Sequence, residues 1–486
     1  MQRRSVIAAL LCLVFWQPTE SFAELEERSC RMLHELLPAA FGQCATLNVP
    51  LDYANPDGAS IDLYVARIPA LTANPAPDPL VLINGGPGGS TVDLYLQLRA
   101  AFEPILRQRD IILLDQRGTG RSLSGLDCEL PEGFDLTTAT PQEIQAGVAS
   151  CIAEFDHDPR FFTTSVAVTD LDRLREALGV DAWNLYGVSY GTRVAQHYLR
   201  RYGDRVRTMI LDGVVPAELT LGPSIAPDAQ NALNAIFARC AESPACAERF
   251  RDLPQHFAEL LARFSNDSIE VVINDSVTGE PKSMLLEASH LQGAIRFMSY
   301  NDATVALLPL TLETAYQGNY LPLAAQADLQ IEGVAESIGF AMHNSVICTE
   351  DVPFFGAAAV TATIPAPYLG SLITDGLRTI CNNWPVGVMD DDFKEPVVSD
   401  RPVLVLSGQH DPVTPPENGE RIIAAGLENA RHIIGRAQGH GLASVGCVPR
   451  LMRSFVEAGS AADLDPSCLD DEPPMPFFLN FQGPGP

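Results

Sequence analysis

Lysine is nearly absent from this sequence: Lys282 and Lys394 are the only two lysines among 486 residues. The chain has 32 basic residues against 61 acidic ones, which gives a formal net charge of −29. A surface this acidic repels phosphate backbones, so the composition argues against nucleic acid as a partner. Hydrophobic residues make up 46% of the chain, which is enough for a sizeable core and excludes a disordered or fibrous protein.

Long apolar runs are also missing, since no segment reaches the roughly 18 apolar residues that a membrane-spanning helix needs. A shorter run, from Val6 to Trp16, follows Arg3 and Arg4 and precedes the small residues Ser21 and Ala23. This layout is typical of a secretory signal peptide, and we expect cleavage after Ala23. The sequence therefore predicts a secreted or periplasmic protein that keeps no stable membrane anchor after cleavage.

The cysteines lack the clustering of metal ligands: there is no Cys-x-x-Cys pair and no close His/Cys grouping, so a zinc site is not expected. Of 11 cysteines, one lies in the predicted signal peptide, which leaves an even number in the mature chain. An even count after export fits disulfide bonds in an oxidising compartment. Spacing alone leaves the connectivity open, and pairing in sequence order is the simplest scheme. The mature cysteines are Cys30, Cys44, Cys128, Cys151, Cys240, Cys246, Cys348, Cys381, Cys447 and Cys468.

Short apolar runs that end in turns alternate with helical patterns through much of the chain. The runs predict buried strands of a parallel sheet, at 81–83, 111–114, 183–186, 208–211 and 403–406. Apolar residues at helical spacing predict helices, among them 166–178 and 192–202. This alternation predicts an α/β fold with a doubly wound, mostly parallel sheet.

The alternation stops between about residues 216 and 400, where the pattern is mainly helical. Ligands bind at the carboxyl edge of an open α/β sheet, so a large insertion there would act as a cap over a site. We therefore divide the chain into a signal peptide (1–23), a first core segment (24–216), a helical cap (217–400) and a second core segment (401–486).

Residues 187–191 read GVSYG and lie between a predicted strand and a predicted helix. This is the context of a nucleophile elbow, a turn so tight that glycines must flank the serine, and it exposes the hydroxyl of Ser189 above the sheet. The bland alternative is an ordinary tight turn. The two alternatives are distinguished by the base and the acid that a nucleophilic serine requires.

A nucleophilic serine needs a base, and the base needs an acid that orients it. Asp411 follows the predicted strand 403–406, and His440 lies further on in a loop flanked by glycines. The order Ser, Asp, His is the one that hydrolases with a nucleophile elbow use. His410 and His432 are the local rivals for the base, but His410 abuts the acid and His432 lies in a predicted strand, 431–434.

Asp212 is the rival for the acid, because it follows the predicted strand 208–211. Its alternative role is to cap a turn. We favour Asp411, since its neighbours His410, Pro412 and Thr414 form a loop typical of the acid position.

Residues 84–89 read NGGPGG and follow the predicted strand 81–83. Glycine lets backbone N–H groups approach an oxyanion, and we expect the donors to be the amides of Gly86 and Tyr190. A phosphate-binding loop is the alternative, but no GK[ST] follows.

Three motifs together resemble those of the proline iminopeptidase family of α/β-hydrolases: GGPG at 85–88, DQRGTGRS at 115–122 and GVSYGT at 187–192. Within that family, the chain is most similar to the large, exported, disulfide-bearing tripeptidyl aminopeptidase branch, and the likeness extends to CNNWP at 381–385 and to the loops of Asp411 and His440. The resemblance implies an α/β-hydrolase fold with a helical cap and a disulfide between Cys348 and Cys381.

The chain departs from the family at Asn84, where proline iminopeptidases usually have histidine, and it lacks the Trp-Glu pair with which their caps hold a substrate amine. Strict proline specificity is therefore not implied. Arg117, within the second motif, is expected to order loops through hydrogen bonds rather than to take part in the chemistry.

These residues predict an exported serine hydrolase that releases residues or short peptides from peptide N-termini, with Ser189, Asp411 and His440 as its triad. The alternatives are an esterase or amidase on small molecules, which uses the same triad, and a non-catalytic binding protein on a hydrolase scaffold. The reaction needs a peptide or small-molecule substrate, and it calls for no cofactor and no metal. The sequence does not determine the oligomeric state.

An aminopeptidase must also recognise a free ammonium group, for which a carboxylate in the cap is the natural partner. Glu350 and Asp351 are the candidates, because they follow Cys348 near the expected junction of cap and core. The alternative is a solvated acidic pair on a surface loop.

Overall fold

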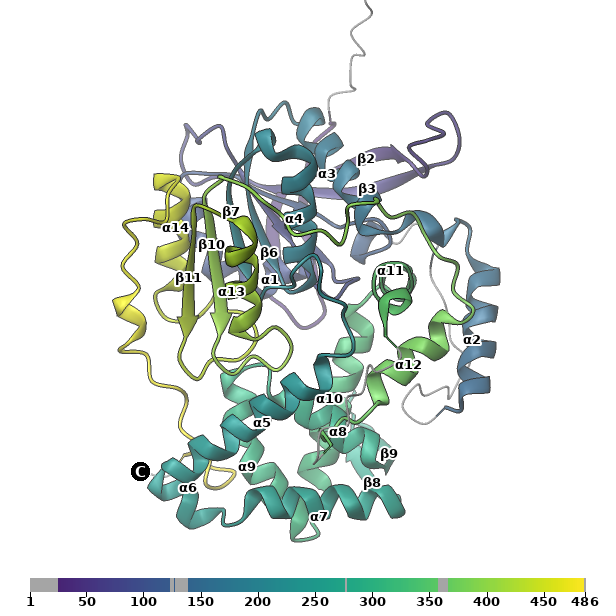
Figure 1. The fold of residues 1–486 in the computed structure, drawn as a ribbon, viewed down its shortest axis with the longest axis vertical. Coiled ribbons are helices and arrows are strands. Elements are labelled where there is room, and N and C mark those ends of the chain that lie inside the picture. The colour runs from purple at the N-terminus through teal and green to yellow at the C-terminus, as the bar shows by residue number, and fades with distance from the viewer. Residues whose placement is uncertain (1–24, 123–125, 127–138, 276–277, 357–365, 485–486) are drawn as a thin grey trace, which may run out of the picture.

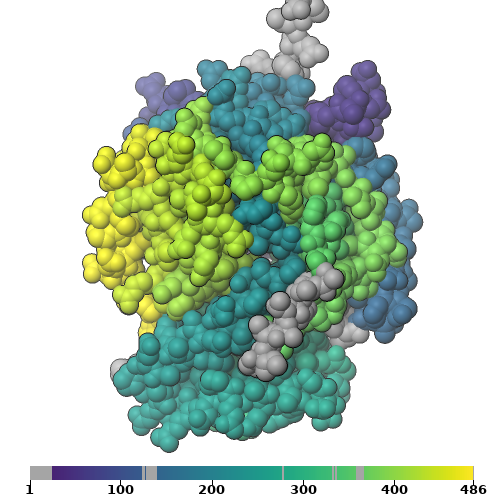
Figure 2. Space-filling model, viewed as in Figure 1, coloured from purple at the N-terminus to yellow at the C-terminus, as the bar shows by residue number. Residues whose placement is uncertain are grey.

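The computed structural model describes residues 25–122, 126, 139–275, 278–356 and 366–484, so the predicted signal peptide lies outside it. A sheet with flanking helices occupies one part of the molecule, and a mainly helical region lies below it in Figure 1 and forms the teal lower part of the surface in Figure 2. Within the described ranges, no helix combines the length and the apolar character needed to cross a bilayer.

The core is a nine-stranded sheet in the order β1-β2-β3-β5-β4-β6-β7-β10-β11. From β5 to β11 all neighbours are parallel, whereas β1, β2 and β3 are antiparallel and β3 joins β5 in the antiparallel sense. The strands are β1 (Arg28–Met32), β2 (Ala40–Pro50), β3 (Ser60–Ile68), β4 (Leu80–Ile83), β5 (Ile111–Leu114), β6 (Trp183–Val188), β7 (Val206–Asp212), β10 (Val403–Gly408) and β11 (Ala430–Gly435).

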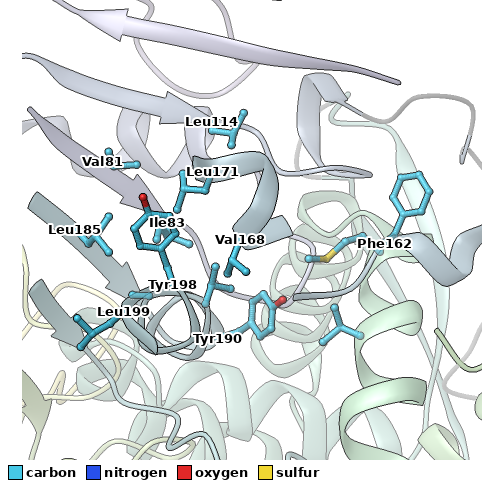
Figure 3. Packing of buried hydrophobic residues seen from close by; sticks show 14 of the residues in the cluster. Val81, Ile83, Leu114, Phe162, Val168, Leu171, Leu185, Tyr190, Tyr198 and Leu199 are labelled. Atoms are coloured by element: carbon cyan, nitrogen blue, oxygen red, sulfur yellow. The ribbon is translucent and has the colours of Figure 1, made fainter. Parts of the chain in front are cut away.

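The parallel strands are short and apolar because helices cover both of their faces. One face packs against α1 (Thr91–Leu106) and α14 (Val448–Ala458). The other packs against α3 (Thr164–Ala177), α4 (Tyr190–Tyr202) and α13 (Pro416–Gly426). Figure 3 shows the second interface, in which strand residues meet the apolar sides of α3 and α4. The predicted doubly wound α/β fold is confirmed.

The N-terminal strands β1 to β3 were not among the predicted elements. β2 alternates buried and exposed residues along much of its length, since one face of this antiparallel end of the sheet is open to solvent. Shorter helical elements connect the core: α2 (Pro141–Glu154), and 3₁₀ turns at Gly120–Ser122, Pro159–Phe161, Gly203–Arg205 and Ser467–Leu469.

A second hydrophobic core lies in the predicted cap. It is mainly helical, as expected, but it also contains an antiparallel hairpin that the sequence analysis did not foresee. Its elements are α5 (Ile225–Glu242), α6 (Pro244–Arg249), α7 (Leu253–Asn266), β8 (Ile269–Asn274), β9 (Pro281–Leu286), α8 (Ala288–Met298), α9 (Asp302–Tyr316) and α10 (Leu321–Ser337).

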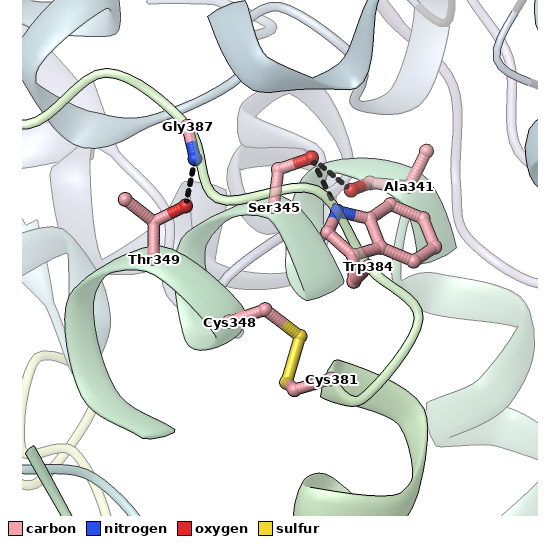
Figure 4. The surroundings of a disulfide bond; sticks show 7 residues. All are labelled: Ala341, Ser345, Cys348, Thr349, Cys381, Trp384 and Gly387. Carbon is pink, nitrogen blue, oxygen red and sulfur yellow. Dashed lines mark hydrogen bonds between the residues drawn. A yellow bond between two sulfur atoms is a disulfide. The ribbon is translucent and has the colours of Figure 1, made fainter. Parts of the chain in front are cut away.

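The rest of the predicted cap segment is divided between the two cores. Helix α11 (Phe340–Val346) and Trp384 pack into the core beneath the sheet rather than into the cap. A π-helical turn (Ile347–Asp351) and a 3₁₀ turn (Val352–Phe354) follow α11, and α12 (Leu372–Cys381) returns the chain. Figure 4 shows how Cys348–Cys381 and the Trp384–Ser345 hydrogen bond join these pieces.

The C-terminal segment leaves the core and packs on the cap. Phe477 is buried in the cap's hydrophobic core, with the Arg239 guanidinium 4.3 Å from its ring centroid. The backbone N–H of Phe478 donates to the Ala306 carbonyl at 2.9 Å. The hydrophobic core of the cap therefore includes a residue from the predicted second core segment, 401–486.

Between described residues, four disulfides join cysteines in sequence order, as the simplest scheme proposed: Cys30–Cys44, Cys240–Cys246, Cys348–Cys381 and Cys447–Cys468. Cys151 is also disulfide-bonded, and its expected partner, Cys128, lies outside the described residues.

Candidate active site

Ser189 lies on the turn between β6 and α4, in the strand–turn–helix context that the motif predicts. Its backbone has φ 56° and ψ −127°, a conformation that non-glycine residues rarely adopt. A Cβ on Gly187 would come within 2.4 Å of the Gly191 carbonyl oxygen, and one on Gly191 within 2.3 Å of the Ile83 carbonyl oxygen. The flanking glycines are thus required by the close approach of the backbone, which is the geometry of a nucleophile elbow.

The glycine-rich loop after β4 lies directly against Ser189. A Cβ on Gly85 would be 2.7 Å from the Ser189 Cβ and 3.3 Å from its Oγ, so only glycine fits there. Asn84 holds the loop in shape, because its Nδ2 donates to the Ser90 carbonyl at 2.7 Å and its Oδ1 accepts from the Gly85 N–H at 2.7 Å. The residue that departs from the family pattern therefore has a structural role here.

Gly86 and Tyr190 lie on the two loops that meet at Ser189. Gly86 has φ 112°, which only glycine adopts readily, and Tyr190 is the first residue of α4. In the hydrogen bonds between described residues, neither backbone N–H has an acceptor. Both amides are thus available to an anionic oxygen beside the Ser189 hydroxyl.

The structure brings Asp411 and His440 together at the carboxyl end of the parallel strands. His440 Nδ1 lies 2.8 Å from Asp411 Oδ2, and the Asp411 carboxylate is fully buried. Its other oxygen accepts from the backbone N–H groups of Val413 and Thr414 at 2.9 and 2.8 Å. The Thr414 hydroxyl donates to Asp411 Oδ2 at 2.7 Å, so the acid is fixed on both sides.

Asp411 and His440 each stabilise the charged form of the other. Burial raises the pKa of Asp411, but the neighbouring His440 and the hydrogen bonds of Thr414 hold it below its usual range. Burial lowers the pKa of His440, and the Asp411 carboxylate outweighs that effect, so the pKa of the imidazole is raised. The arrangement stabilises an imidazolium, as a base that accepts the proton of a serine requires.

Asp212, the rival acid, has a different set of partners. Its carboxylate accepts from the backbone N–H groups of Leu442 at 2.8 and 3.0 Å and of Ala443 at 2.9 Å, and from the Tyr186 hydroxyl at 2.9 Å. Burial raises the pKa of Asp212. Asp212 therefore anchors the chain just after His440, while Asp411 bonds to the ring itself.

The other candidate histidines lie elsewhere. The His432 ring is 2.9 Å from the Ser407 hydroxyl, between β11 and β10. Burial lowers the pKa of His410, whose backbone N–H donates to the Gln438 carbonyl at 2.9 Å. Among the described residues neither ring hydrogen-bonds to Asp411, whereas the ring of His440 does.

The cap contributes a contact that the sequence analysis missed. The backbone N–H of His440 donates to the Tyr300 carbonyl at 2.6 Å, and the two rings meet edge to face with centroids 5.2 Å apart. Tyr300 follows α8, far from His440 in the sequence, and no local motif marks it. The histidine loop is thus held by the core and by the cap together.

The DQRGTGRS motif forms the turn beside the glycine-rich loop. Arg117 donates twice to Asp170, at 2.6 Å each, and also to the carbonyls of Leu51 and Phe161. Asp115 accepts from the hydroxyl of Ser90, at the start of α1, at 3.0 Å. The prediction that Arg117 orders loops through hydrogen bonds is confirmed.

Glu350 is fully buried. Its two oxygens accept from the backbone N–H and the hydroxyl of Thr164, both at 2.8 Å, and the Thr164 hydroxyl is 2.5 Å from the hydroxyl of Tyr190. Burial raises the pKa of Glu350 to about 7. Through Thr164, this carboxyl group helps to hold Tyr190, the residue after Ser189, in place.

Asp351 is equally buried and fully occupied. Its oxygens accept from Arg193 Nη1 at 3.0 Å, from the Leu221 N–H at 2.8 Å and from Lys394 Nζ at 3.3 Å. The expectation that Glu350 and Asp351 bind a substrate amine therefore does not fit this arrangement, because neither carboxylate is accessible. The alternative of a solvated surface pair does not fit either.

Comparison with known proteins places this geometry in a family. Residues 78–443 match the alpha/beta hydrolase fold family, and the chain belongs to that family. Carboxylesterase B of Mycobacterium tuberculosis (strain ATCC 25618 / H37Rv) is 32% identical over 409 residues, which cover 78% of this chain and 76% of that protein.

Two relatives with peptidase names match shorter stretches. Serine protease Hip1 of the same strain is 32% identical over 223 residues, 42% of each chain. Tripeptidyl aminopeptidase of Streptomyces lividans is 33% identical over 190 residues, 36% of this chain and 35% of that protein. Among solved structures, proline iminopeptidase of Mycobacterium smegmatis covers 85% of this chain and 98% of its own, with 14% identity and a TM-score of 0.39.

Proposed function

We propose that this protein is an exported serine hydrolase that releases residues or short peptides from the N-termini of peptides. The observation that carries the proposal is the convergence at one sheet edge of the Ser189 elbow, two unpaired loop amides and the Asp411–His440 pair at 2.8 Å. The similarity to a serine protease and a tripeptidyl aminopeptidase supports peptides as substrates.

In the proposed reaction, Ser189 Oγ attacks the scissile carbonyl while His440 Nε2 accepts its proton. The carbonyl oxygen becomes an oxyanion, which the N–H groups of Gly86 and Tyr190 stabilise by about 3 kcal/mol per donor in comparable sites. His440 then gives its proton to the leaving amine, which leaves an acyl-enzyme on Ser189. Water releases the acyl group by the same steps, with Asp411 holding the imidazole in one orientation throughout.

An esterase or amidase acting on small molecules is the second candidate, because a relative that matches 78% of this chain is named a carboxylesterase. Both reactions pass through the same acyl-enzyme. A non-catalytic binding protein has less support, since the serine, base, acid and oxyanion amides are all present.

Export is part of the proposal. The disulfides in both the core and the cap are of a kind that persists in oxidising compartments, and the apolar N-terminal run supplies the signal. We propose cleavage after Ala23 and a secreted or periplasmic mature protein.

A digest of a peptide library with free and with acetylated N-termini tests the proposed activity. Mass spectrometry of the products should show cleavage near the free N-termini and little cleavage of the acetylated peptides. Internal cleavage of both sets would replace the aminopeptidase by an endopeptidase. Turnover of small esters alone, with every peptide intact, would favour the esterase.

A further inference from the structure

Two hydrogen-bond donors near the candidate active site are buried without an acceptor. They are the Nε of Arg296, on α8, and the hydroxyl of Tyr368, in the chain before α12, and neither has a partner among the described residues. Tyr368 is only 5% exposed. A buried polar group without a partner is costly, so two together call for an explanation.

Tyr368 is held firmly in this position. Its backbone N–H donates to Gln230 Oε1 of α5 at 2.9 Å, and its carbonyl accepts from Gln292 Nε2 of α8 at 2.6 Å. Two cap helices therefore fix the residue, while its hydroxyl keeps no bond of its own. The packing therefore fixes the position of the Tyr368 hydroxyl but provides no acceptor for it.

Arg296 links this place to the active site. Its guanidinium carbon is 5.5 Å from the ring centroid of Tyr300, whose ring lies 5.2 Å from that of His440. The Tyr368 carbonyl accepts from Gln292, which lies one helical turn before Arg296 on α8, so Tyr368 lies beside the part of α8 that carries Arg296. Among the described residues Arg296 forms no ion pair, whereas Arg239 of the neighbouring helix α5 pairs with Asp302 at 3.4 Å.

A positive charge beside two unpaired donors is suited to an anionic acceptor. A carboxylate has two oxygens, so it can accept from the Arg296 guanidinium and from the Tyr368 hydroxyl at once. A neutral carbonyl would leave the charge without a counter-ion.

We propose that Arg296 and Tyr368 form a subsite for a carboxylate in the part of the substrate that leaves. His440 is the group that donates a proton to the leaving group. The Tyr300 ring contacts both the His440 ring and the Arg296 guanidinium, so Arg296 lies near the leaving group. The inference rests on the proposed hydrolytic function and narrows its substrates. A peptide with glutamate after the scissile bond fits, as does an ester whose alcohol portion carries a carboxylate.

The test uses two pairs of substrates that differ only in one charge. The peptide pair has glutamate or glutamine after the scissile bond, and the ester pair has a phenol leaving group with or without a carboxylate. Wild-type protein should show a higher kcat/KM for the anionic member of each pair. Arg296→Gln should lower kcat/KM for the anionic member by about ten- to a hundredfold more than for the neutral member, whatever loss the two share.

Tyr368→Phe separates recognition from folding. The hydroxyl has no partner in the free protein, so its removal should leave the thermal unfolding temperature unchanged or slightly higher. It should nevertheless weaken the preference for the anionic substrates several-fold. Arg263→Gln is the matched control, because Arg263 is a cap arginine bonded to the Tyr320 hydroxyl, and its loss should leave the preference intact.

Equal losses on charged and neutral substrates would overturn the subsite, and so would wild-type protein without a charge preference. If Arg296→Gln does not fold, the wild-type preference and Tyr368→Phe decide the question. Charge preference on the esters with no cleavage of the peptides would remove the aminopeptidase and keep the subsite. Cleavage of both pairs without charge preference would remove the subsite and keep the aminopeptidase. Failure to cleave either pair would overturn both proposals.

Discussion

The nucleophile and the base of the candidate triad are held by different parts of the molecule. Ser189 is fixed by the core alone: its backbone N–H donates to the Asp212 carbonyl at 2.9 Å, and the helix behind it is anchored by buried ionic groups. His440 is fixed by Asp411 from the core and by the Tyr300 carbonyl from the cap, at 2.8 and 2.6 Å. A change in the cap should therefore disturb the base and leave the nucleophile in place.

Removal of the nucleophile should have the largest effect. Ser189→Ala should abolish turnover, and labelling by a fluorophosphonate probe should disappear with it. The fold should stay intact, because the change removes one hydroxyl from a turn whose backbone the flanking glycines determine. Circular dichroism and the unfolding temperature supply the control. Turnover above a trace in the purified variant would exclude Ser189 as the nucleophile.

Loss of either aspartate should have the next largest effects, and the two losses should differ in kind. Asp411→Asn should lower kcat by about 10⁴-fold, because it disturbs the orientation of His440 and leaves a developing imidazolium without its partner. Asp212→Asn should act mainly on stability, since it weakens the bonds to the Leu442 and Ala443 amides. Steady-state kinetics and thermal unfolding of both variants test this assignment. A greater loss of kcat in Asp212→Asn at equal stability would reverse it.

The contact of the histidine loop with the cap can be broken at Gly439. A Cβ there would lie 2.3 Å from the Tyr300 carbonyl oxygen, so Gly439→Ala must displace the loop or the cap. We expect a loss in kcat of about 10²-fold, since small displacements of a catalytic group have effects of this size. Gly376→Ala on α12, where a Cβ meets nothing within 4 Å, is the matched control and should be neutral. Similar activities in the two variants would show that the cap does not position the base.

The pH dependence reports on the same base with a smaller effect. Free His440 must be neutral to accept the serine proton, so kcat/KM should fall as the pH drops through the pKa of the imidazole. That pKa is raised by Asp411 against the effect of burial, so the acid limb should lie above about 6.5. In the residual activity of Asp411→Asn, the limb should move to lower pH. An unchanged limb would mean that another group titrates.

Glu350→Gln should have the smallest effect on activity. The glutamine oxygen can still accept from the Thr164 N–H, and its amide can donate to the Thr164 hydroxyl, so the support beneath Tyr190 is largely kept. Rates on free-amine and on neutral substrates should change equally, by less than about threefold. A rise in KM confined to free-amine substrates would restore the role in amine binding that the sequence suggested.

Local patterns were enough to predict the parallel sheet and the elbow, and they singled out Asp411, whose carboxylate lies against the His440 ring. Each depends on neighbours along the chain: a buried strand needs a short apolar run, and the elbow needs glycine at 187 and 191. The alternating pattern of β2 carries a similar local signal, but this strand belongs to an antiparallel, half-exposed end of the sheet and is not a continuous apolar run.

What the sequence did not reveal depends on contacts between distant segments. Tyr300 meets His440 only because the cap folds back over the core, and no periodicity marks it. The sequence offered Glu350 and Asp351 as an amine-binding pair or as solvated surface charges, since their partners Thr164 and Arg193 lie on α3 and α4, over 150 residues away. Charge and position alone do not show whether a carboxylate faces solvent or a buried arginine.

The packing of Phe477 in the cap has a consequence for the order in which the molecule assembles. Met475 reaches Asp302 across 173 residues of sequence, and Phe477 completes a hydrophobic core whose other members come from residues 225 to 369. During synthesis, most of the cap emerges long before this segment exists. The hydrophobic core of the cap therefore stays incomplete until β10, β11 and the C-terminal segment have been synthesised. Closing so long a loop late is entropically costly and slow. We expect a chain truncated before Phe477 to be trapped with an exposed cap that binds chaperones.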